Sequence, residues 1–255
     1  MTTDNEPNPE IRYTDLHCHV LPGLDDGARD WDEALSMARQ AVRGGATRLV
    51  ATPHVMRGVY YTSPEDISRA VLELRARLED TRIPLEVIPG SEVYLSSGVA
   101  LEYRSGKLLP IGGSGYLLVE LPSLYFPRYV FRELFELRLA GAGVIVAHPE
   151  RNTELSKKKG LIEELLETEV MFQVNAGSFT GFFGAEARAC AEYLLREGLV
   201  HFIGSDAHSG QSAFTSNVGA DVSEPLRRIS RLNREDKGFW TSLEARATRL
   251  LAGKL

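Results

Sequence analysis

Two of the six histidines in this 255-residue chain stand one residue apart, in the stretch DLHCHVLPGLDDG at residues 15–27. If residues 13–20 form a strand, His17 and His19 project to the same side, because side chains two apart on a strand share a face. Two imidazoles on one face can begin a metal site. They can equally be a chance pair on a solvated strand, so the rest of the chain has to distinguish the two interpretations.

Further candidate ligands also stand at the ends of short apolar runs. They are His54 in ATPH, Glu92 in PGSE, Glu120 in LLVELP, His148 in VIVAHPER, and Asp206 and His208 in FIGSDAH, with Asp26 in the loop after the first pair. In barrel enzymes the carboxyl ends of the strands and the loops after them gather at one face and hold the active site. We therefore expect these residues to converge. His201 begins an apolar run, and we interpret it as a structural histidine outside the site.

The nine candidate ligands are imidazoles and carboxylates, and none is a thiolate. Such a set is typical of a catalytic zinc, manganese or iron(II) site and not of a structural zinc site. Nine ligands are too many for one ion and predict two or three ions with bridging carboxylates, an arrangement suited to phosphoryl transfer. Arg151 is the candidate for binding phosphoryl oxygens, with a surface salt bridge as its alternative. His54 or Asp206 is the candidate general acid. Asp26 precedes a glycine, so a turn is its alternative role.

Short apolar runs alternate with amphipathic ones along the chain. The expected strands are Tyr13–Val20, Thr47–Thr52, Leu85–Glu92, Tyr116–Leu121, Gly143–Ala147, Val170–Val174 and Val200–Ser205. The expected helices are Trp31–Gly44, Pro64–Asp80, Arg128–Ala140, Gly160–Thr168, Ala185–Glu197 and Asp236–Leu251. This alternation predicts one α/β domain over residues 13–255, after a loose tail at residues 1–12. Seven strands favour an incomplete barrel, with an open doubly wound sheet as the alternative.

Composition narrows the functional classes. The net charge of −6 argues against nucleic-acid binding, which depends on Lys and Arg at the phosphate backbone. No apolar run reaches the length of a membrane span, and the acidic start MTTDNEPNPE is unlike a signal peptide. Two cysteines do not make a disulfide framework. We expect a cytoplasmic protein without membrane insertion.

The motifs DLHCH…DDG, ATPH, GSE, VELP, AHPER and SDAH, in this order, resemble those of the PHP (polymerase and histidinol phosphatase) superfamily. Within it, HCHVLPGLDDGA, ATPHVMRGVY, AHPERN, VNAGSFTGFFG and HFIGSDAH resemble the bacterial manganese-dependent tyrosine-protein phosphatases of capsule and exopolysaccharide loci, the CpsB/CapC/YwqE-like group. The similarity runs from residue 13 to about residue 250. It implies a distorted (β/α)7 barrel of TIM-barrel type and a trinuclear metal site. It also implies hydrolysis of phosphotyrosine on the tail of a polysaccharide co-polymerase tyrosine kinase.

The resemblance carries ligands over residue by residue. His17, His19, Glu92 and Asp206 match the ligands of a first metal, and Glu92 would bridge to a second metal that His148 also binds. The remaining matches, His54, Asp26, Glu120 and His208, complete the second and third ions in a division that stays open. Manganese is the expected ion; iron, zinc and magnesium accept the same ligands.

One position departs from the resembled group. Its members carry a second phosphate-binding arginine several residues after the SDAH motif. Here that position, near Ala213, holds no cation, and no Lys or Arg occurs between Arg196 and Arg227. We expect Arg57, in HVMRG, or Arg128, in FPRY, to bind substrate in its place alongside Arg151. The alternative is a site that lacks this second anchor and has a high KM.

Of three rival interpretations, the first is rejected and two stay open. The run from Cys190 to Arg196 has the C-x5-R spacing of cysteine-based tyrosine phosphatases, but it lies inside an amphipathic helix without glycine, so we interpret Cys190 as core. A PHP phosphoesterase acting on a small molecule such as histidinol phosphate or a nucleotide is the alternative enzyme. A metal-binding regulatory module is the alternative without catalysis.

Two loops are expected to lie near the site. We interpret VNAGSFTGFFG as a loop at the mouth of the metal site, with Asn175 and Ser178 as groups behind the ligands. The stretch GVYYT at residues 58–62, together with Tyr125, Phe126 and Arg128, is a candidate wall for an aromatic ring. Alternatively, these aromatic side chains only cover the rim of the barrel and bind no ligand.

Overall fold

The computed structural model describes residues 11–210 and 219–255. Its strands are β1 (Tyr13–Cys18), β2 (Ala46–Ala51), β3 (His54–Val55), β4 (Glu86–Pro89), β5 (Glu92–Tyr94), β6 (Tyr116–Glu120), β7 (Gly143–Ala147), β8 (Met171–Asn175) and β9 (Phe202–Gly204). Its α-helices are α1 (Trp31–Arg43), α2 (Pro64–Asp80), α3 (Val99–Arg104), α4 (Tyr129–Leu139), α5 (Lys159–Leu166), α6 (Ala185–Arg196), α7 (Ser223–Leu232) and α8 (Phe239–Leu251). Short 3-10 helices are η1 (Ile111–Gly113), η2 (Pro149–Arg151) and η3 (Ala176–Thr180).

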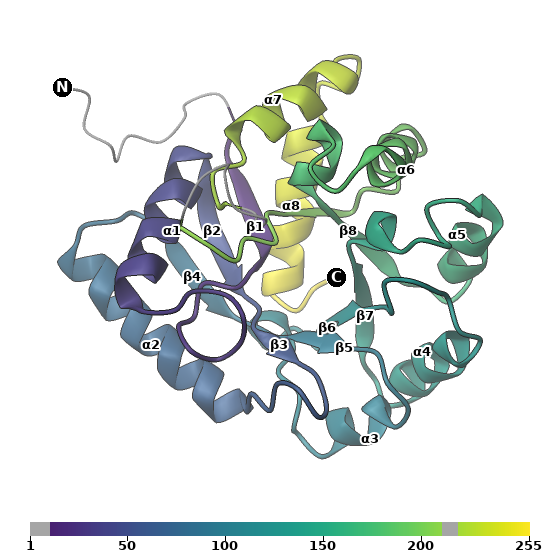
Figure 1. Ribbon diagram of the computed structural model, residues 1–255, viewed down its shortest axis with the longest axis horizontal. Helices are drawn as coiled ribbons and strands as arrows, with labels where there is room; N and C mark the ends of the chain where they lie inside the picture. Colours follow the sequence, from purple (N-terminus) through teal and green to yellow (C-terminus); the bar gives the residue numbers. More distant parts are fainter. Residues whose placement is uncertain (1–10, 211–218) are drawn as a thin grey trace.

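The strands form two parallel sheets. One has the order β1-β2-β4 and the other the order β3-β5-β6-β7-β8-β9. Helices α1 and α2 pack beside the smaller sheet, and α4, α5 and α6 lie along the outer side of the larger one (Figure 1). The prediction of one α/β domain with parallel strands is confirmed. The strands divide between two sheets, so their pairing does not show a closed barrel.

The division falls inside the expected strand Leu85–Glu92. Its first part, β4, pairs with β2, whereas its second part, β5, lies between β3 and β6. The chain crosses from one sheet to the other at Gly90, where a Cβ atom would lie 2.9 Å from Cγ1 of Val50. Only glycine allows so close an approach of the backbone to β2. This crossing brings Glu92 opposite His54 in the register of β3 and β5.

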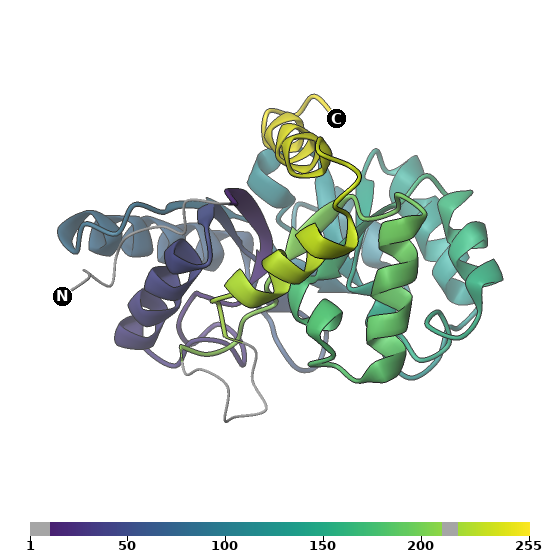
Figure 2. The same ribbon diagram turned by 90° about the horizontal axis from the view of Figure 1, so that it is seen from above.

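A compact inner core occupies the space between the strands. It contains Leu16, Val50, Ile88, Ile111, Leu118, Ile145, Ala147 and Phe202, together with Ala247 and Leu250 of α8. Helix α8 lies over one end of the strands (Figure 2), where Glu244 accepts from Thr14 and Arg246 donates to the carbonyl of His201. Thr14 and His201 stand at the starts of β1 and β9, so α8 closes the amino ends. The polar candidate ligands lie at the opposite, carboxyl ends of the strands.

Local signals set the helix starts that were predicted. The Asp30 side chain accepts from the backbone N–H of Glu33 at the start of α1, and Ser63 accepts from Asp66 before Pro64 opens α2. Of the expected tail, residues 1–10 lie outside the described residues, while Ile11 is buried in the core. Among residues 11–210 and 219–255, no helix combines the length and the apolar character needed to cross a bilayer.

Candidate metal centre

The carboxyl ends of the strands bring all nine predicted ligands into one cluster. Glu92 lies at its centre: Oε2 is 3.1 Å from Nε2 of His17 and 3.0 Å from Nδ1 of His54, and Oε1 is 3.0 Å from Nε2 of His148. The Nε2 atoms of His17 and His19 are 3.0 Å apart, so the two imidazoles project together as the strand pattern predicted. His17, His19 and Glu92 are fully buried.

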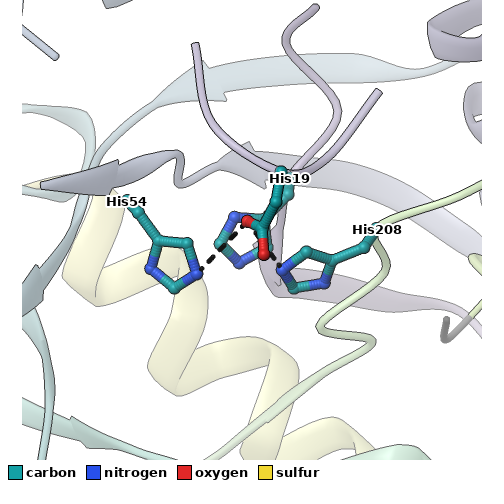
Figure 3. A group of neighbouring side chains, drawn as sticks. His19, His54 and His208 are labelled. Carbon is teal, nitrogen blue, oxygen red and sulfur yellow. Dashed lines mark ion pairs between the residues drawn. The ribbon is translucent and has the colours of Figure 1, made fainter. Parts of the chain in front are cut away.

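The remaining members surround this centre. Asp206 Oδ1 lies 3.4 Å from Nε2 of both His17 and His19, and 3.6 Å from Nδ1 of His208. Asp26 Oδ1 lies 3.6 Å from Nε2 of His54 and of His208, as the dashed lines in Figure 3 mark. Asp26 therefore faces the cluster, although its side chain is 55% exposed.

Potential ligand atoms fall into three overlapping groups, and within each group all the atoms lie within 4.8 Å of one another. They are His19, Asp26, His54 and His208; His17, His19 and Glu92; and His54, Glu92 and Glu120. Figure 3 shows the rings of His19, His54 and His208 converging from three separate segments of the chain. Shared members link the groups, since His19, His54 and Glu92 each belong to two. This is the layout that neighbouring ions with bridging ligands require.

Unsatisfied buried atoms indicate that cations belong in this cluster. Glu92 Oε2, His54 Nδ1 and Glu120 Oε2 are buried and have no hydrogen-bond partner among the described residues. Leaving such atoms unpaired costs about 1–3 kcal/mol each. Glu92 Oε2 is within 3.4 Å of three imidazole nitrogens, yet none of these contacts has hydrogen-bond geometry. Oxygen and nitrogen lone pairs that face one another at this distance fit a shared metal ion, so the donor set accepts divalent cations.

The charges of the cluster are strongly coupled. Burial opposes the charged form of His17, but the carboxylates of Glu92 and Asp206 outweigh it and raise its pKa to about 9. The imidazoles in turn hold the pKa of Glu92 well below its usual range, against the effect of burial. Burial and the neighbouring His19 lower the pKa of His208 to about 4, which leaves its imidazole neutral. Protons thus occupy positions that cations would take, and metal binding would release them.

Groups behind the cluster fix the orientation of two imidazoles. Nδ1 of His17 donates to Gln173 Oε1 at 2.9 Å, and Nδ1 of His19 donates to Asp25 Oδ2 at 2.6 Å. Each ring therefore turns Nε2 toward the cluster. Nε2 of Gln173 donates to Asn175 Oδ1, and Nδ2 of Asn175 donates in turn to Asp206 Oδ2 at 2.7 Å. Asn175 therefore contacts a ligand from behind, as predicted. Ser178 instead donates to Glu150 at 2.7 Å.

Asp25 and Gln173 were not predicted. Asp25 stands next to Asp26 in LDDG, and sequence alone offers no way to rank the two carboxylates. Gln173 has a signal that could have found it, because it is a polar residue inside the apolar run VMFQV. A polar side chain at a buried strand position needs a partner, and here the partner is His17.

We expect Asp25→Asn to weaken metal binding. The carboxylate of Asp25 accepts from His19 and also from the backbone N–H of His54, and removing its charge makes His19 a poorer ligand. Loss of such a partner typically lowers metal affinity about 10- to 100-fold. Calorimetric titration of Mn²⁺ into metal-stripped protein measures this, with the exposed Asp32→Asn as the matched control. Equal affinities for both variants would contradict the role given to Asp25.

Two cluster residues adopt a strained backbone. His148 has φ of +30° and Asp206 has φ of +54°, in the left-handed region that non-glycine residues rarely adopt. His148 also precedes a proline, which disfavours compact backbone at that position. Strain of this kind costs about 1–3 kcal/mol per residue and concentrates at functional sites. His148 directly follows β7 and Asp206 comes two residues after the end of β9, where the chain must turn to aim each side chain at the cluster.

The predicted arginines have different surroundings. Nη1 of Arg151 donates to Asp206 Oδ2, which places this guanidinium at the edge of the cluster. Arg57 is instead ion-paired with Glu102 and lines a cavity of about 640 Å³ with Tyr60 and Tyr61. Arg128 is exposed at the start of α4. Within the described part of the chain, neither Arg57 nor Arg128 has a hydrogen bond or ion pair to a predicted ligand, and their expected role in substrate binding stays a prediction.

Three further expectations concern residues near the site. His201 lies outside the cluster: its Nδ1 accepts from the N–H of Phe172 at 3.0 Å. Cys190 is buried in α6, and burial raises the pKa of its thiol to about 12, so the C-x5-R spacing carries no nucleophile. The position near Ala213 lies outside the described residues.

Comparison with known proteins identifies the group to which this arrangement belongs. The family described as capsular polysaccharide synthesis, CpsB/CapC, matches residues 13–216. The chain belongs to the CpsB/CapC family. The tyrosine-protein phosphatase YwqE of Bacillus subtilis is 38% identical over 195 residues, which cover 76% of this chain and 77% of YwqE. The tyrosine-protein phosphatase CpsB of Streptococcus pneumoniae is 28% identical over 201 residues, covering 76% of this chain and 82% of that protein.

Solved structures agree with this membership. A crystal structure from work on YwqE and CpsB, described there as unique metal-dependent tyrosine phosphatases, superposes with a TM-score of 0.84. It is 34% identical to this CpsB/CapC-family chain and covers 95% of both chains. Dihydropyrimidinase from Brevibacillus agri superposes with a TM-score of 0.54 at 12% identity, covering 94% of this chain and 70% of that one. This second likeness concerns the fold alone.

Proposed function

We propose that this CpsB/CapC-family chain is a metal-dependent protein-tyrosine phosphatase. The observation that carries the proposal is the buried His and carboxylate cluster around Glu92, with Arg151 at its edge. The relatives named as tyrosine-protein phosphatases support the reaction class, and the solved structure described as metal-dependent supports the role of cations. A phosphoric monoester is the substrate class that such a site fits best.

The proposal assigns the nine cluster residues to two or three divalent ions. The metal ligands would be His17, His19, Asp26, His54, Glu92, Glu120, His148, Asp206 and His208, with Glu92 as a bridging group. Manganese is the proposed ion, and iron, zinc and magnesium accept the same donors. When bound, such ions lower the pKa of water and neutralise charge on phosphoryl oxygens.

The chain's own residues bind and orient the phosphoryl group. Arg151 lies at the edge of the cluster with Nε and Nη2 free of hydrogen bonds among the described residues, so this edge can donate to two phosphoryl oxygens. Asp206 holds the guanidinium through Oδ2 while its Oδ1 faces the imidazoles. His54, 13% exposed at the mouth, is the proposed proton donor to the leaving oxygen. A phenolate is a good leaving group, so this donor contributes less than it would for an alkyl ester.

We expect Tyr60→Leu to weaken binding of aromatic phosphoesters. The ring of Tyr60 stacks on His54 at 5.6 Å with an interplanar angle of 11°, so it borders the place where a leaving phenol would lie. Aromatic contacts of this kind contribute about 0.5–1.5 kcal/mol, which corresponds to a rise in KM of roughly two- to tenfold. Steady-state kinetics with p-nitrophenyl phosphate measures it. The neighbouring Tyr61→Leu, at a residue 78% exposed, is the control, and an equal rise for both variants would exclude a specific role of Tyr60.

We also propose a substrate and a cellular location for the enzyme, and a barrel arrangement for its two sheets. The substrate would be the phosphotyrosine tail of a polysaccharide co-polymerase tyrosine kinase in the cytoplasm, and the reaction would regulate capsule or exopolysaccharide synthesis. The two sheets would act as one distorted barrel. In support, the N–H of Asp206 donates to the carbonyl of His17 and the N–H of His19 donates to that of Ala207, which joins β1 to the segment after β9.

One substrate panel tests the proposed function. Purified protein with Mn²⁺ is assayed against p-nitrophenyl phosphate, a phosphotyrosine peptide, a phosphoserine peptide and histidinol phosphate, with Asp206→Asn as the inactive control. We expect phosphotyrosine to be hydrolysed with the highest kcat/KM among the natural esters. A preference for histidinol phosphate would establish the small-molecule phosphoesterase instead. Metal binding without hydrolysis of any ester would indicate a regulatory module.

A further inference from the structure

In the glycine-rich motif VNAGSFTGFFG, Asn175 contacts the proposed ligand Asp206, and the residues after it lie against the segment that carries Arg151. Residues 176–180 of the motif form η3, and Phe183 follows in the turn before α6. The guanidinium carbon of Arg151 lies 4.4 Å from the centre of the Phe183 ring. A planar guanidinium over an aromatic face is attracted by the negative face of the ring. The contact joins two segments that are 32 positions apart in the chain.

We propose that Phe183 is a positioning residue that holds Arg151 ready for the phosphoryl group. The inference rests on the proposed function, since it takes Arg151 as the group that binds phosphate. Arg151 has long rotatable bonds and its side chain is 36% exposed, so without support it would sample many rotamers. Asp206 fixes one end of the guanidinium through Nη1, and the ring of Phe183 fixes its plane. The edge formed by Nε and Nη2 is thereby presented in one orientation.

A second set of contacts ties the two segments together. Glu150, the residue before Arg151, is buried, and its Oε1 accepts from the N–H of Asn175 at 2.9 Å and from Ser178 Oγ at 2.7 Å. Because η2 and η3 share this carboxylate, the backbone of Arg151 and the loop that carries Phe183 hold a fixed relative position. Gly181, with φ of +85°, supplies the turn that returns the chain toward Arg151.

The neighbouring Phe182 provides a matched control. Its ring meets that of Phe183 edge to face at 5.1 Å, and it is 46% exposed. No cation lies over the ring of Phe182 among the described residues, whereas Phe183 has Arg151. The guanidinium of Arg151 thus lies over the ring of Phe183 and not over that of Phe182, and Phe182 is the more exposed of the two.

The test compares Phe183→Leu, Phe183→Tyr and Phe182→Leu in the manganese-loaded protein. For Phe183→Leu we expect the KM for p-nitrophenyl phosphate and the calorimetric Kd for inorganic phosphate to rise together, by about three- to tenfold. The kcat should change less than twofold. Phe183→Tyr retains an aromatic face and should restore both constants, and Phe182→Leu should leave both within twofold. A thermal unfolding curve for each variant checks that the fold is kept.

A double-mutant cycle shows whether Phe183 acts through Arg151. In an Arg151→Ala background, Phe183→Leu should have no further effect on the Kd for phosphate, because the contact it supports is gone. Additive effects, or equal effects of Phe182→Leu and Phe183→Leu, would overturn the inference. Failure of the wild type to hydrolyse phosphotyrosine would refute the proposed function only. The Kd for inorganic phosphate is measured without turnover and would still decide the role of Phe183.

Discussion

Substitution of Asp206 is expected to lower kcat by about 10³-fold, at the upper end of what removal of one group that stabilises the transition state electrostatically does. Asp206 serves two sets of contacts at once. Its Oδ1 faces the Nε2 atoms of His17 and His19 at 3.4 Å, and its Oδ2 accepts from Arg151 and from Asn175. Removing the carboxylate therefore removes a proposed metal ligand and also releases the phosphate-binding guanidinium.

The choice of variant separates chemistry from folding. Asp206 has φ of +54°, a conformation that asparagine tolerates far better than alanine. Asp206→Asn keeps the volume and the backbone preference but loses the charge, so its thermal unfolding should stay close to that of the wild type while kcat falls. Asp206→Ala should lose activity and some stability as well. His148→Ala should behave like Asp206→Ala, because His148 also has a left-handed backbone and lies 3.0 Å from Glu92.

His201→Ala is the control for this prediction. Burial, together with the charge of Arg246, lowers the pKa of His201 to about 4, so it is a neutral hydrogen-bond acceptor beneath α8. Its loss should leave kcat within about tenfold of the wild type, the range expected for a residue that acts only on local structure. If His201→Ala reduced kcat as much as His148→Ala does, the rule that the site lies only at the carboxyl ends of the strands would be wrong.

That rule explains why the cluster could be predicted without coordinates. Parallel strands end at a common edge, so any polar residue directly after an apolar run is brought to the same place. His148 directly follows β7, and His54 and Asp206 come within three residues of the ends of β2 and β9; all three contact the cluster. The prediction needed only the order of short apolar runs and the residue after each.

The groups behind the ligands could not be predicted in the same way. Asp25 and Asp26 are adjacent in one loop, and which carboxylate turns inward depends on how that loop folds over His19. Arg57 and Arg128 follow strands as Arg151 does, but Arg57 finds Glu102 on α3, a six-residue helix too short to leave a periodic signal. Partner choice between surface segments is a tertiary property, and the sequence pattern of one segment does not encode it.

The strand boundaries show a similar limit. The apolar run at residues 85–92 has the composition of one strand, and nothing in its pattern reveals that β4 and β5 join different sheets. The cause is a close approach of Gly90 to Val50, a contact between segments 40 positions apart. Helix α7 was missed because its ten residues, SEPLRRISRL, bury only Leu226 and Ile229. Its apolar residues nevertheless recur at helical spacing, so the sequence did carry a signal for this helix.

Removal of metal is expected to abolish activity altogether. The cluster places five imidazoles and four carboxylates together with buried atoms that lack hydrogen-bond partners among the described residues. Without divalent cations, the positive charge on its imidazoles is balanced by Glu92 and Asp206 and does not bind a phosphoryl dianion in their place. Incubation with excess chelator should reduce turnover of p-nitrophenyl phosphate to background. Adding Mn²⁺ after the chelator is removed should restore it. A titration of restored activity against added Mn²⁺ reports how many ions each chain needs.

Thiol alkylation is the matched control, because it targets the other chemistry by which tyrosine phosphatases work. Both cysteines are free and buried, and burial raises the pKa of the Cys18 and Cys190 thiols, the latter to about 12. A protonated, inaccessible thiol is neither a nucleophile nor a good target for alkylation. Iodoacetamide should therefore leave kcat/KM unchanged, and Cys190→Ser should do the same apart from any loss of stability. Full activity in excess chelator, combined with inactivation by iodoacetamide, would refute the metal-dependent mechanism and transfer the chemistry to a cysteine.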